Sequence, residues 1–269
     1  MISTLSILFT LYILIFLYSL RIRDNSIVDV FWWGGFMVIA ILTFIDSMKG
    51  IPQIVTTGLI ILWWLRIVWH IGIRKLKDHK EDPRYAKWRE EWWNGWYFLI
   101  RSFLQVYMFQ MILMLIVATP IFIVNLSVIP ANAGIYFFDT GLQVKPGMTE
   151  QFLLMIWTTI ALVWLIFETI ADRQLSKFIN TKKPWQIFTW GLYRYSRHPN
   201  YFGESVFWLG ISLIALPFSY LWLIGWMTIT FLLLFVSWVP LQEARYIGRP
   251  EWEVYKSRTS VLIPWWPKK

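Results

Sequence analysis

The chain has 269 residues, of which 57% are hydrophobic and 15% are charged, and its formal net charge is +9. This composition lies outside the usual range of soluble globular domains and is typical of a membrane protein. The absence of cysteine excludes disulfides, thiolate metal sites and a catalytic thiol. The sequence also lacks an HExxH motif, a Walker A loop and a GxGxxG motif. Metalloprotease, P-loop and Rossmann functions therefore have no support, and we expect neither a metal site nor a nucleic-acid partner.

Seven hydrophobic runs approach the length of roughly 20 residues that a helix needs to cross a bilayer. They cover residues 2–20, 28–46, 53–73, 102–125, 151–171, 203–218 and 220–239. The sixth run is short and ends at Pro217, so we expect it either to tilt little or to pair with the seventh as a tight hairpin. The first run lacks a preceding basic segment, which favours a retained helix over a cleaved signal peptide. We therefore predict an all-α fold, with residues 1–269 forming one membrane domain of seven transmembrane helices.

The distribution of lysine and arginine predicts the orientation of these helices. Most of the 25 Lys and Arg residues fall in the first, third and fifth loops and in the C-terminal tail. The loops on the other side carry only Lys49 and Lys145. By the positive-inside rule, we expect the N-terminus outside the cell and the C-terminal tail in the cytoplasm.

Two of the loops differ in character. Residues 74–102 mix charged side chains with four tryptophans, which predicts an amphipathic interfacial helix, with folding over a cytoplasmic ligand as the alternative. Residues 125–150 are rich in Gly, Pro, Asn and Thr, as expected of an exposed outer loop. Their segment VIPANAGI resembles palindromic repeats that some bacterial genomes insert into coding sequence, so we assign this loop no function.

The second and third spans contain the ionisable residues Asp29, Arg66 and His70. Charged groups inside a membrane are costly, which makes each of them a candidate for function. Arg66 and His70 are four residues apart and share a helix face, so we expect both to face the bundle interior or a water-filled cavity. Asp29 opens the second span, where a helix-capping carboxylate is the alternative interpretation.

A pair of carboxylates marks the end of the fifth span. Glu168 and Asp172 lie one turn apart on one helix face, where like charges repel each other unless donors are present. The candidate donors are Arg194, Arg197, Arg258, or the hydroxyls and amides of a ligand. A salt-bridge network without a ligand is the alternative.

The segment GLYRYSRHPNYFGE, residues 191–204, carries more polar groups than a membrane helix needs for anchoring. They include Arg194, Arg197, His198, Asn200 and Glu204. The basic tail after residue 241 adds Tyr246, Tyr255 and Arg258. Anionic lipid headgroups would require only the basic residues. The interleaved Tyr, Asn, Glu and Asp are typical of a site that orients a ligand with phosphates, riboses and a planar ring.

Five segments in chain order support a family resemblance: SIVDVFWWGG (26–35), EDPRYAKWRE (81–90), ETIADRQLSKF (168–178), YRYSRHPNYFGE (193–204) and YKSRTSVLIPW (255–265). With these segments the chain resembles bacterial membrane proteins of the DUF1295 type, allied to steroid 5α-reductases and similar to 3-oxo-5α-steroid 4-dehydrogenases. An RHPxY segment also occurs in isoprenylcysteine carboxyl methyltransferases, which use S-adenosylmethionine.

The resemblance implies a seven-helix fold in the bacterial inner membrane, with NADPH entering from the cytosol. Carried over residue by residue, it implies cofactor contacts at Glu168, Asp172, Tyr193, Arg194, Arg197, His198, Asn200, Tyr201, Glu204, Tyr246, Tyr255 and Arg258. The spacing before Tyr255 departs by about one residue from the animal enzymes. The Gln-Glu pair and the tyrosine with which steroid enzymes polarise the substrate carbonyl have no match in this sequence. We therefore expect the catalytic donor to be Asp29, Arg66 or His70.

The function expected from these observations is NADPH-dependent reduction of a carbonyl-conjugated C=C bond in a lipidic substrate, either steroid-like or isoprenoid. The expected partners are that substrate and the membrane lipids. One alternative keeps the fold but transfers a methyl group from S-adenosylmethionine. A second alternative is a non-catalytic protein whose basic face binds lipid headgroups.

Overall fold

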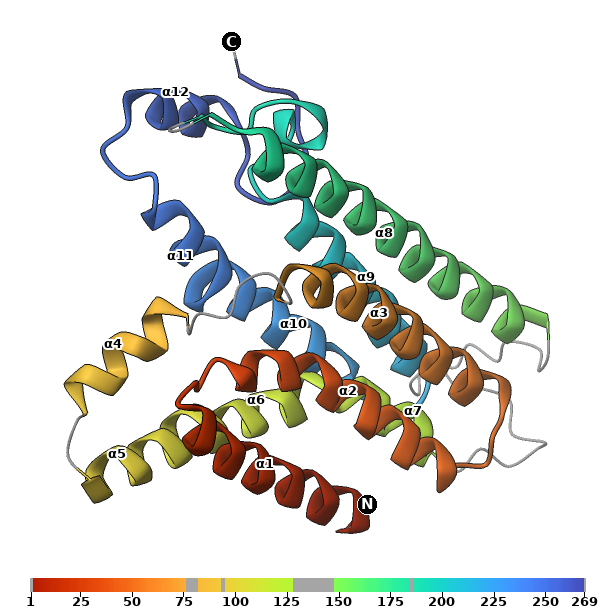
Figure 1. Cartoon of the computed structure of the whole chain (residues 1–269). Coiled ribbons are helices and arrows are strands. Elements are labelled where there is room, and N and C mark those ends of the chain that lie inside the picture. The colour runs from red at the N-terminus through yellow and green to blue at the C-terminus, as the bar shows by residue number, and fades with distance from the viewer. Residues whose placement is uncertain (1, 76–81, 93–94, 128–147, 184–185, 269) are drawn as a thin grey trace. The chain divides into compact units, whose positions relative to one another are not determined.

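A computed structural model describes residues 2–75, 82–92, 95–127, 148–183 and 186–268 (Figure 1). Within these ranges the secondary structure is helical and contains no strand, apart from an isolated parallel bridge between Ser196 and Ser260. The chain forms two compact units, Met1–Ala133 and Gly134–Lys269, and each is described by itself. The predicted all-α class is confirmed for the described residues.

Unit 1 contains the first seven α-helices and a π-helical turn. They are α1 (Ile2–Ile22), α2 (Ile27–Ile45), α3 (Ile51–Lys75), α4 (Pro83–Glu91), α5 (Gly95–Arg101), η1 (Ser102–Met108), α6 (Phe109–Val117) and α7 (Thr119–Leu126). Aromatic side chains fill much of its core: Trp63 meets Trp33 and Phe36 edge-on, with ring centroids 5.4 and 5.9 Å apart. This packing holds α2 against α3.

Unit 2 contains five α-helices and three short helical turns. They are α8 (Met148–Thr181), η2 (Gly191–Arg194), α9 (Pro199–Ala215), η3 (Tyr220–Trp222), α10 (Leu223–Phe231), η4 (Leu232–Val236), α11 (Trp238–Ala244) and α12 (Pro250–Arg258). A small core of Phe178, Phe188 and Tyr193 closes the segment after α8, with the two phenylalanine rings stacked 4.7 Å apart.

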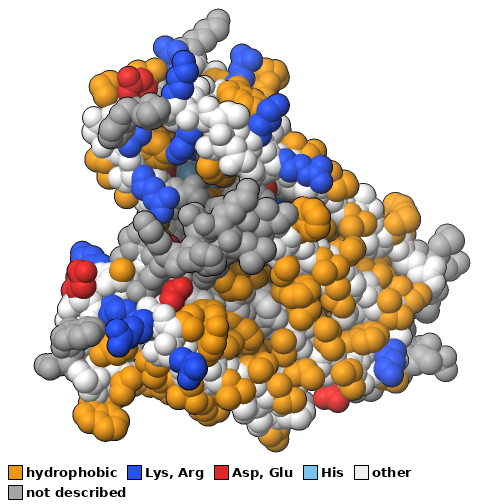
Figure 2. Space-filling model, viewed as in Figure 1, with side chains coloured by type: hydrophobic (Ala, Val, Ile, Leu, Met, Phe, Trp, Pro, Cys, Tyr) orange, Lys and Arg blue, Asp and Glu red, His pale blue; other side chains and the backbone are white. Residues whose placement is uncertain are grey.

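Six helical runs among the described residues are long and apolar enough to cross a membrane. They are Ile2–Ile22, Ile27–Ile45, Ile51–Trp69, Gly95–Val117, Gln151–Thr181 and Tyr220–Ala244. Many of their hydrophobic side chains are exposed, and Figure 2 shows such side chains over much of the visible surface of unit 1. In the same view, Lys and Arg side chains gather where unit 2 carries α12. The chain therefore has the helices of a multi-pass membrane protein.

The predicted fourth span, 102–125, differs from the structure at both ends. The helical run begins earlier, at Gly95, passes through the π-helical turn and ends at Val117. The chain then breaks at Ala118, and α7 starts with a proline in its first turn. Pro120 lacks a backbone N–H and cannot continue the preceding helix, although it is well suited to begin a new one.

The two loops singled out in the sequence are described only in part. Where an interfacial helix is predicted, the structure describes the helix α4, and its position relative to a membrane stays a prediction. The Asp82 side chain caps its N-terminus by accepting a hydrogen bond from the Arg84 backbone at 2.9 Å. Residues 76–81 and 93–94 on either side of it lie outside the described residues, as do residues 128–147 of the loop 125–150.

Helices α8 and α9 approach each other closely because glycines face α8. A Cβ atom at Gly203 would lie 2.8 Å from the Cβ of Glu168 and 3.1 Å from its backbone. A Cβ atom at Gly210 would lie 2.9 Å from both the Cβ and the backbone nitrogen of Ala161. Small residues at seven-residue spacing thus bring the two backbones together, as in many membrane helix pairs. The contact places Glu168 directly against the first half of α9.

The segment between α8 and α9 is held in place by the tail and by α8. Gly191 has a positive φ of 65°, and the Gln174 side chain accepts a hydrogen bond from the next backbone N–H at 2.9 Å. The Arg197 backbone donates to the Ser260 carbonyl at 2.8 Å, and the Trp265 backbone donates to the Tyr195 carbonyl at 2.9 Å. The GLYRYSRHPNYFGE segment is therefore bonded both to α8 and to the C-terminal tail.

Candidate functional site

Six of the predicted cofactor residues form one group in unit 2, which we call the unit 2 polar cluster. Its members are Glu168, Asp172, His198, Asn200, Tyr201 and Glu204. Three carboxylates and a histidine of this cluster are each less than a tenth exposed, at 3%, 8%, 4% and 4% for Glu168, Asp172, His198 and Glu204. Buried ionisable groups at this density are costly and point to a binding role.

The unit 2 polar cluster joins three helices through side-chain hydrogen bonds. The Asn200 amide in the first turn of α9 donates to the Asp172 carboxylate on α8 at 3.2 Å. On the opposite side, the Gln242 amide on α11 donates to the Tyr201 hydroxyl. The expectation that the α8 carboxylates need donors is thus met for Asp172 by an amide of the same segment.

Arg197 and His198 share a carboxylate that sequence analysis left without a role. The Arg197 Nε and the His198 Nε2 lie 3.1 and 3.0 Å from the same oxygen of Glu243 on α11. The guanidinium also lies 5.8 Å from the Trp252 ring centroid, and the His198 ring stacks on Tyr201 at 5.5 Å. The protein therefore fixes both side chains before any ligand binds. An acidic residue at the end of the last span, just before a basic tail, is the sequence signal that could have identified Glu243.

Two buried tyrosines lie beside the cluster. The Tyr255 hydroxyl donates to the backbone carbonyl of Tyr193, which anchors α12 to the segment before α9. The hydroxyl oxygen of Tyr193 has no hydrogen-bond partner within the described residues, although the side chain is only 5% exposed. Burial, together with the charge of Asp172, raises the pKa of Tyr193 well above its usual value. Tyr193 therefore offers a neutral hydroxyl that a ligand could satisfy.

The remaining predicted cofactor residues lie nearer the surface. Arg194 and Arg258 are exposed, and Tyr246 stacks on Trp252 with ring centroids 4.9 Å apart. Arg258 lines an open pocket of about 320 Å³ whose other walls include Lys256, Lys268, Trp265 and Trp266. The structure thus separates the predicted residues into a buried polar group and a cationic surface.

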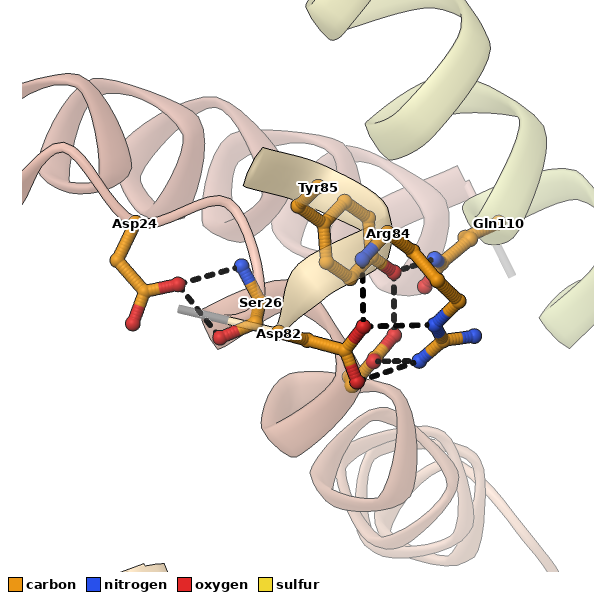
Figure 3. Close-up of polar contacts among 7 residues, drawn as sticks. Asp24, Ser26, Asp82, Arg84, Tyr85 and Gln110 are labelled. Atoms are coloured by element: carbon orange, nitrogen blue, oxygen red, sulfur yellow. Dashed lines mark hydrogen bonds and ion pairs between the residues drawn. The ribbon is translucent and has the colours of Figure 1, made fainter. Parts of the chain in front are cut away.

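In unit 1, Asp29 belongs to a second polar group with residues from α4 and α6. Figure 3 shows Arg84 and Tyr85 of α4 and Gln110 of α6 within this group. The Tyr85 hydroxyl donates to the Asp29 carboxylate at 2.6 Å, and the Arg84 Nη2 donates to it at 3.1 Å. The Gln110 amide donates to the Tyr85 oxygen at 3.1 Å, and Asp82 holds the Arg84 Nε at 2.9 Å. The SIVDVFWWGG and EDPRYAKWRE segments therefore meet in space. Asp29 binds α4 through this contact, which the capping interpretation did not anticipate.

The other two predicted catalytic residues, Arg66 and His70, lie on α3. The side chain of Arg66 is partly buried, as expected of a group that avoids lipid. The side chain of His70 lies outside the described part of the structure. Tyr85 was not predicted from the sequence, because it lies on α4, far along the chain from Asp29, and nothing in the residues around it marks it as the partner of a carboxylate on α2.

We expect Tyr85→Phe to destabilise unit 1. The change removes a buried hydroxyl that donates to Asp29 and accepts from Gln110, and both of these partners are themselves partly buried. The expected loss is about 1 to 3 kcal/mol of unfolding free energy, the usual cost of leaving a buried polar group unsatisfied. Thermal unfolding of the purified protein measures it. Tyr97→Phe is the matched control because the Tyr97 side chain is half exposed, and equal effects of the two changes would contradict this account of Asp29.

Comparison with known proteins gives one match. A family model described as "Protein of unknown function (DUF1295)" matches residues 15–259. The matched range includes the unit 2 polar cluster and the Asp29 group. Searches of curated proteins and of solved structures found no match to the chain. The DUF1295 part of the sequence-based resemblance is therefore confirmed.

Proposed function

We propose that this chain, which belongs to the DUF1295 family, is a membrane-bound NADPH-dependent reductase. Its substrate in this proposal is a lipid with a C=C bond conjugated to a carbonyl, either steroid-like or isoprenoid. The observation that carries the proposal is the unit 2 polar cluster, in which buried carboxylates, an amide and a phenol gather beside the fixed Arg197 guanidinium. A site that only attracted lipid headgroups would not need buried acidic groups.

The chemistry of the unit 2 residues fits NADPH. Arginines suit phosphate groups through paired donation, and Arg194, Arg197 and Arg258 lie on the segments that flank the cluster. Carboxylates and amides suit ribose hydroxyls and a carboxamide, and Asp172 and Asn200 supply such groups. The Tyr193 hydroxyl adds a buried group that has no partner among the described residues.

NADPH would supply the hydride, and the residues of the chain have to supply the proton and the stabilisation of negative charge at the carbonyl oxygen. Of the three residues predicted for this role, Arg66 and His70 remain candidates. Because Asp29 is engaged by Tyr85 and Arg84, we assign it the role of orienting the Tyr85 hydroxyl. Burial, with a contribution from Asp29, raises the pKa of Tyr85, so its hydroxyl keeps its proton at neutral pH.

The proposed arrangement in the membrane is seven spans, with the N-terminus outside and the tail in the cytoplasm. The seventh helix in this count is α9, whose 17 residues make it slightly too short to be included among the six membrane-spanning runs given above. Its mostly buried surface favours a helix packed inside the protein, where a short span is tolerated.

The cysteine-free sequence makes this topology directly testable. In intact cells, we expect a membrane-impermeant maleimide to label Lys49→Cys from outside. Lys177 is exposed on α8 and is predicted to lie on the cytoplasmic side. Lys177→Cys should therefore react only after the membrane is permeabilised. Labelling of Lys177→Cys in intact cells would contradict the orientation.

Transfer of deuterium tests the reaction itself. Native protein in lipid vesicles is incubated with NADPH that carries deuterium at the transferred position and with steroid or isoprenoid enones as probes. We expect mass spectrometry to find deuterium in the saturated product, at the carbon β to the carbonyl. Methylation of the lipid fraction by labelled S-adenosylmethionine, without deuterium transfer, would favour the methyltransferase instead.

A further inference from the structure

A second buried polar group lies in unit 1, where the α2–α3 turn meets the end of α7. We call it the Asn125 cluster, and its members are Thr43, Gln53, Thr56, Thr57 and Asn125. All five side chains are less than a tenth exposed, and four of them are at most 1% exposed. None of them is charged.

Hydrogen bonds fix the orientation of the two amides. The Asn125 Nδ2 donates to the Ala40 carbonyl at 3.2 Å, to the Thr43 hydroxyl at 2.9 Å and to the Thr57 hydroxyl at 3.3 Å. The Gln53 Nε2 donates to the Val124 carbonyl at 3.1 Å. Rotating either amide would place its oxygen against a backbone carbonyl, so the observed orientation is the only satisfactory one.

This orientation leaves three buried oxygen atoms without a hydrogen-bond partner within the described residues. They are Asn125 Oδ1, Gln53 Oε1 and Thr56 Oγ1. Gln53 and Thr56 are three residues apart on one face of α3, and the α7 residues 124 and 125 pack against that helix. Buried oxygens that no donor satisfies are rare in folded proteins, which indicates a bound guest.

The local charges favour a cation as that guest. The amide nitrogens already donate to protein groups, so the atoms left over are oxygen acceptors. The C-terminal ends of α2 and α7 bring partial negative charge to the cluster, and the start of α3, where Gln53 lies, brings partial positive charge, so the oxygen acceptors decide the preference. Because the cluster contains no carboxylate, a monovalent ion fits its charge better than a divalent one.

A glycine leaves room at the edge of the cluster. A Cβ atom at Gly50 would lie 2.7 Å from Gln53 Oε1, so any larger residue there would press on one of the three oxygens. We propose that the Asn125 cluster binds a monovalent cation, with Gln53, Thr56 and Asn125 as its oxygen ligands. Carbonyl oxygens and helix C-termini are the groups with which membrane proteins bind sodium. The ion joins α3 and α7.

Salt-dependent thermal stability tests this site. The purified full chain is unfolded in sodium, potassium or choline chloride at equal ionic strength and without nucleotide, so the result is independent of the proposed reductase. We expect sodium or potassium to raise the apparent melting temperature above that in choline by about 2 to 4 °C, and the effect to saturate.

Two variants and one control make the test specific. Thr56→Val removes one oxygen at constant shape, and Gly50→Ala fills the space beside another, so each should abolish the cation effect. Thr158→Val, which removes a hydroxyl that bonds within α8, should preserve it. Equal melting temperatures of the native chain in all three salts, as a buried water would give, would overturn the proposal. So would a cation effect that survives in both Thr56→Val and Gly50→Ala.

Discussion

Gly203→Ala is expected to destabilise the protein, whereas the same change at Gly58 is not. The new methyl group at position 203 would meet the Cβ of Glu168 at 2.8 Å and its backbone at 3.1 Å. A backbone cannot move aside as a flexible side chain can, so α9 must shift away from α8. Overpacking of this kind costs about 1 to 3 kcal/mol.

Gly58→Ala provides a matched control because Gly58 also lies inside a helix, yet a Cβ atom there would have nothing within 4 Å. Alanine is the better helix former by up to about 1 kcal/mol, so this change should be neutral or stabilising. Thermal unfolding of both variants gives the comparison. If Gly203→Ala melted at or above the native temperature, the close approach of α8 and α9 would be wrong.

Gly203→Ala should also weaken the proposed nucleotide site. Glu168 belongs to the unit 2 polar cluster, and the new methyl group would press directly on it. Gly210→Ala disturbs the same helix pair about two turns further along α9, where the new methyl group would meet Ala161. We therefore expect the first change to reduce nucleotide binding more than the second at equal loss of stability.

The spans were predictable because hydrophobic length is a local property of the sequence. Six apolar runs appear where the sequence places them, within a few residues at most ends. The break at Ala118 was not anticipated, because the run 102–125 carries no charged residue and Pro120 is its only proline. Hydropathy alone cannot show whether a proline bends a helix or starts a new one.

The site was predictable only in part. Glu168 and Asp172 were expected to share a face and to need donors, and Asn200 provides one for Asp172. The pairing of Arg197 with Glu243 and of Asp29 with Tyr85 depends on segments 46 and 56 residues apart in the chain, for which spacing gives no rule. Such contacts are set by tertiary packing.

The second large effect concerns Arg197, whose side chain is 9% exposed and ion-paired with Glu243. Arg197→Ala removes a cation fixed at the edge of the unit 2 polar cluster, and Asp172→Asn removes a charge inside it. Both changes should abolish stabilisation by NADPH. Lys177→Ala, an exposed cation on α8 that belongs to neither group, should leave it intact.

The measurement that tests the account most directly is a thermal titration of the purified protein with NADPH, NADH and S-adenosylmethionine. A ligand that binds the folded state stabilises it by mass action, by about 2.7 kcal/mol at a hundredfold excess over its dissociation constant. The account predicts a rise in melting temperature with NADPH that exceeds the rise with NADH and is lost in Arg197→Ala. Stabilisation by S-adenosylmethionine alone, or by none of the three, would contradict it.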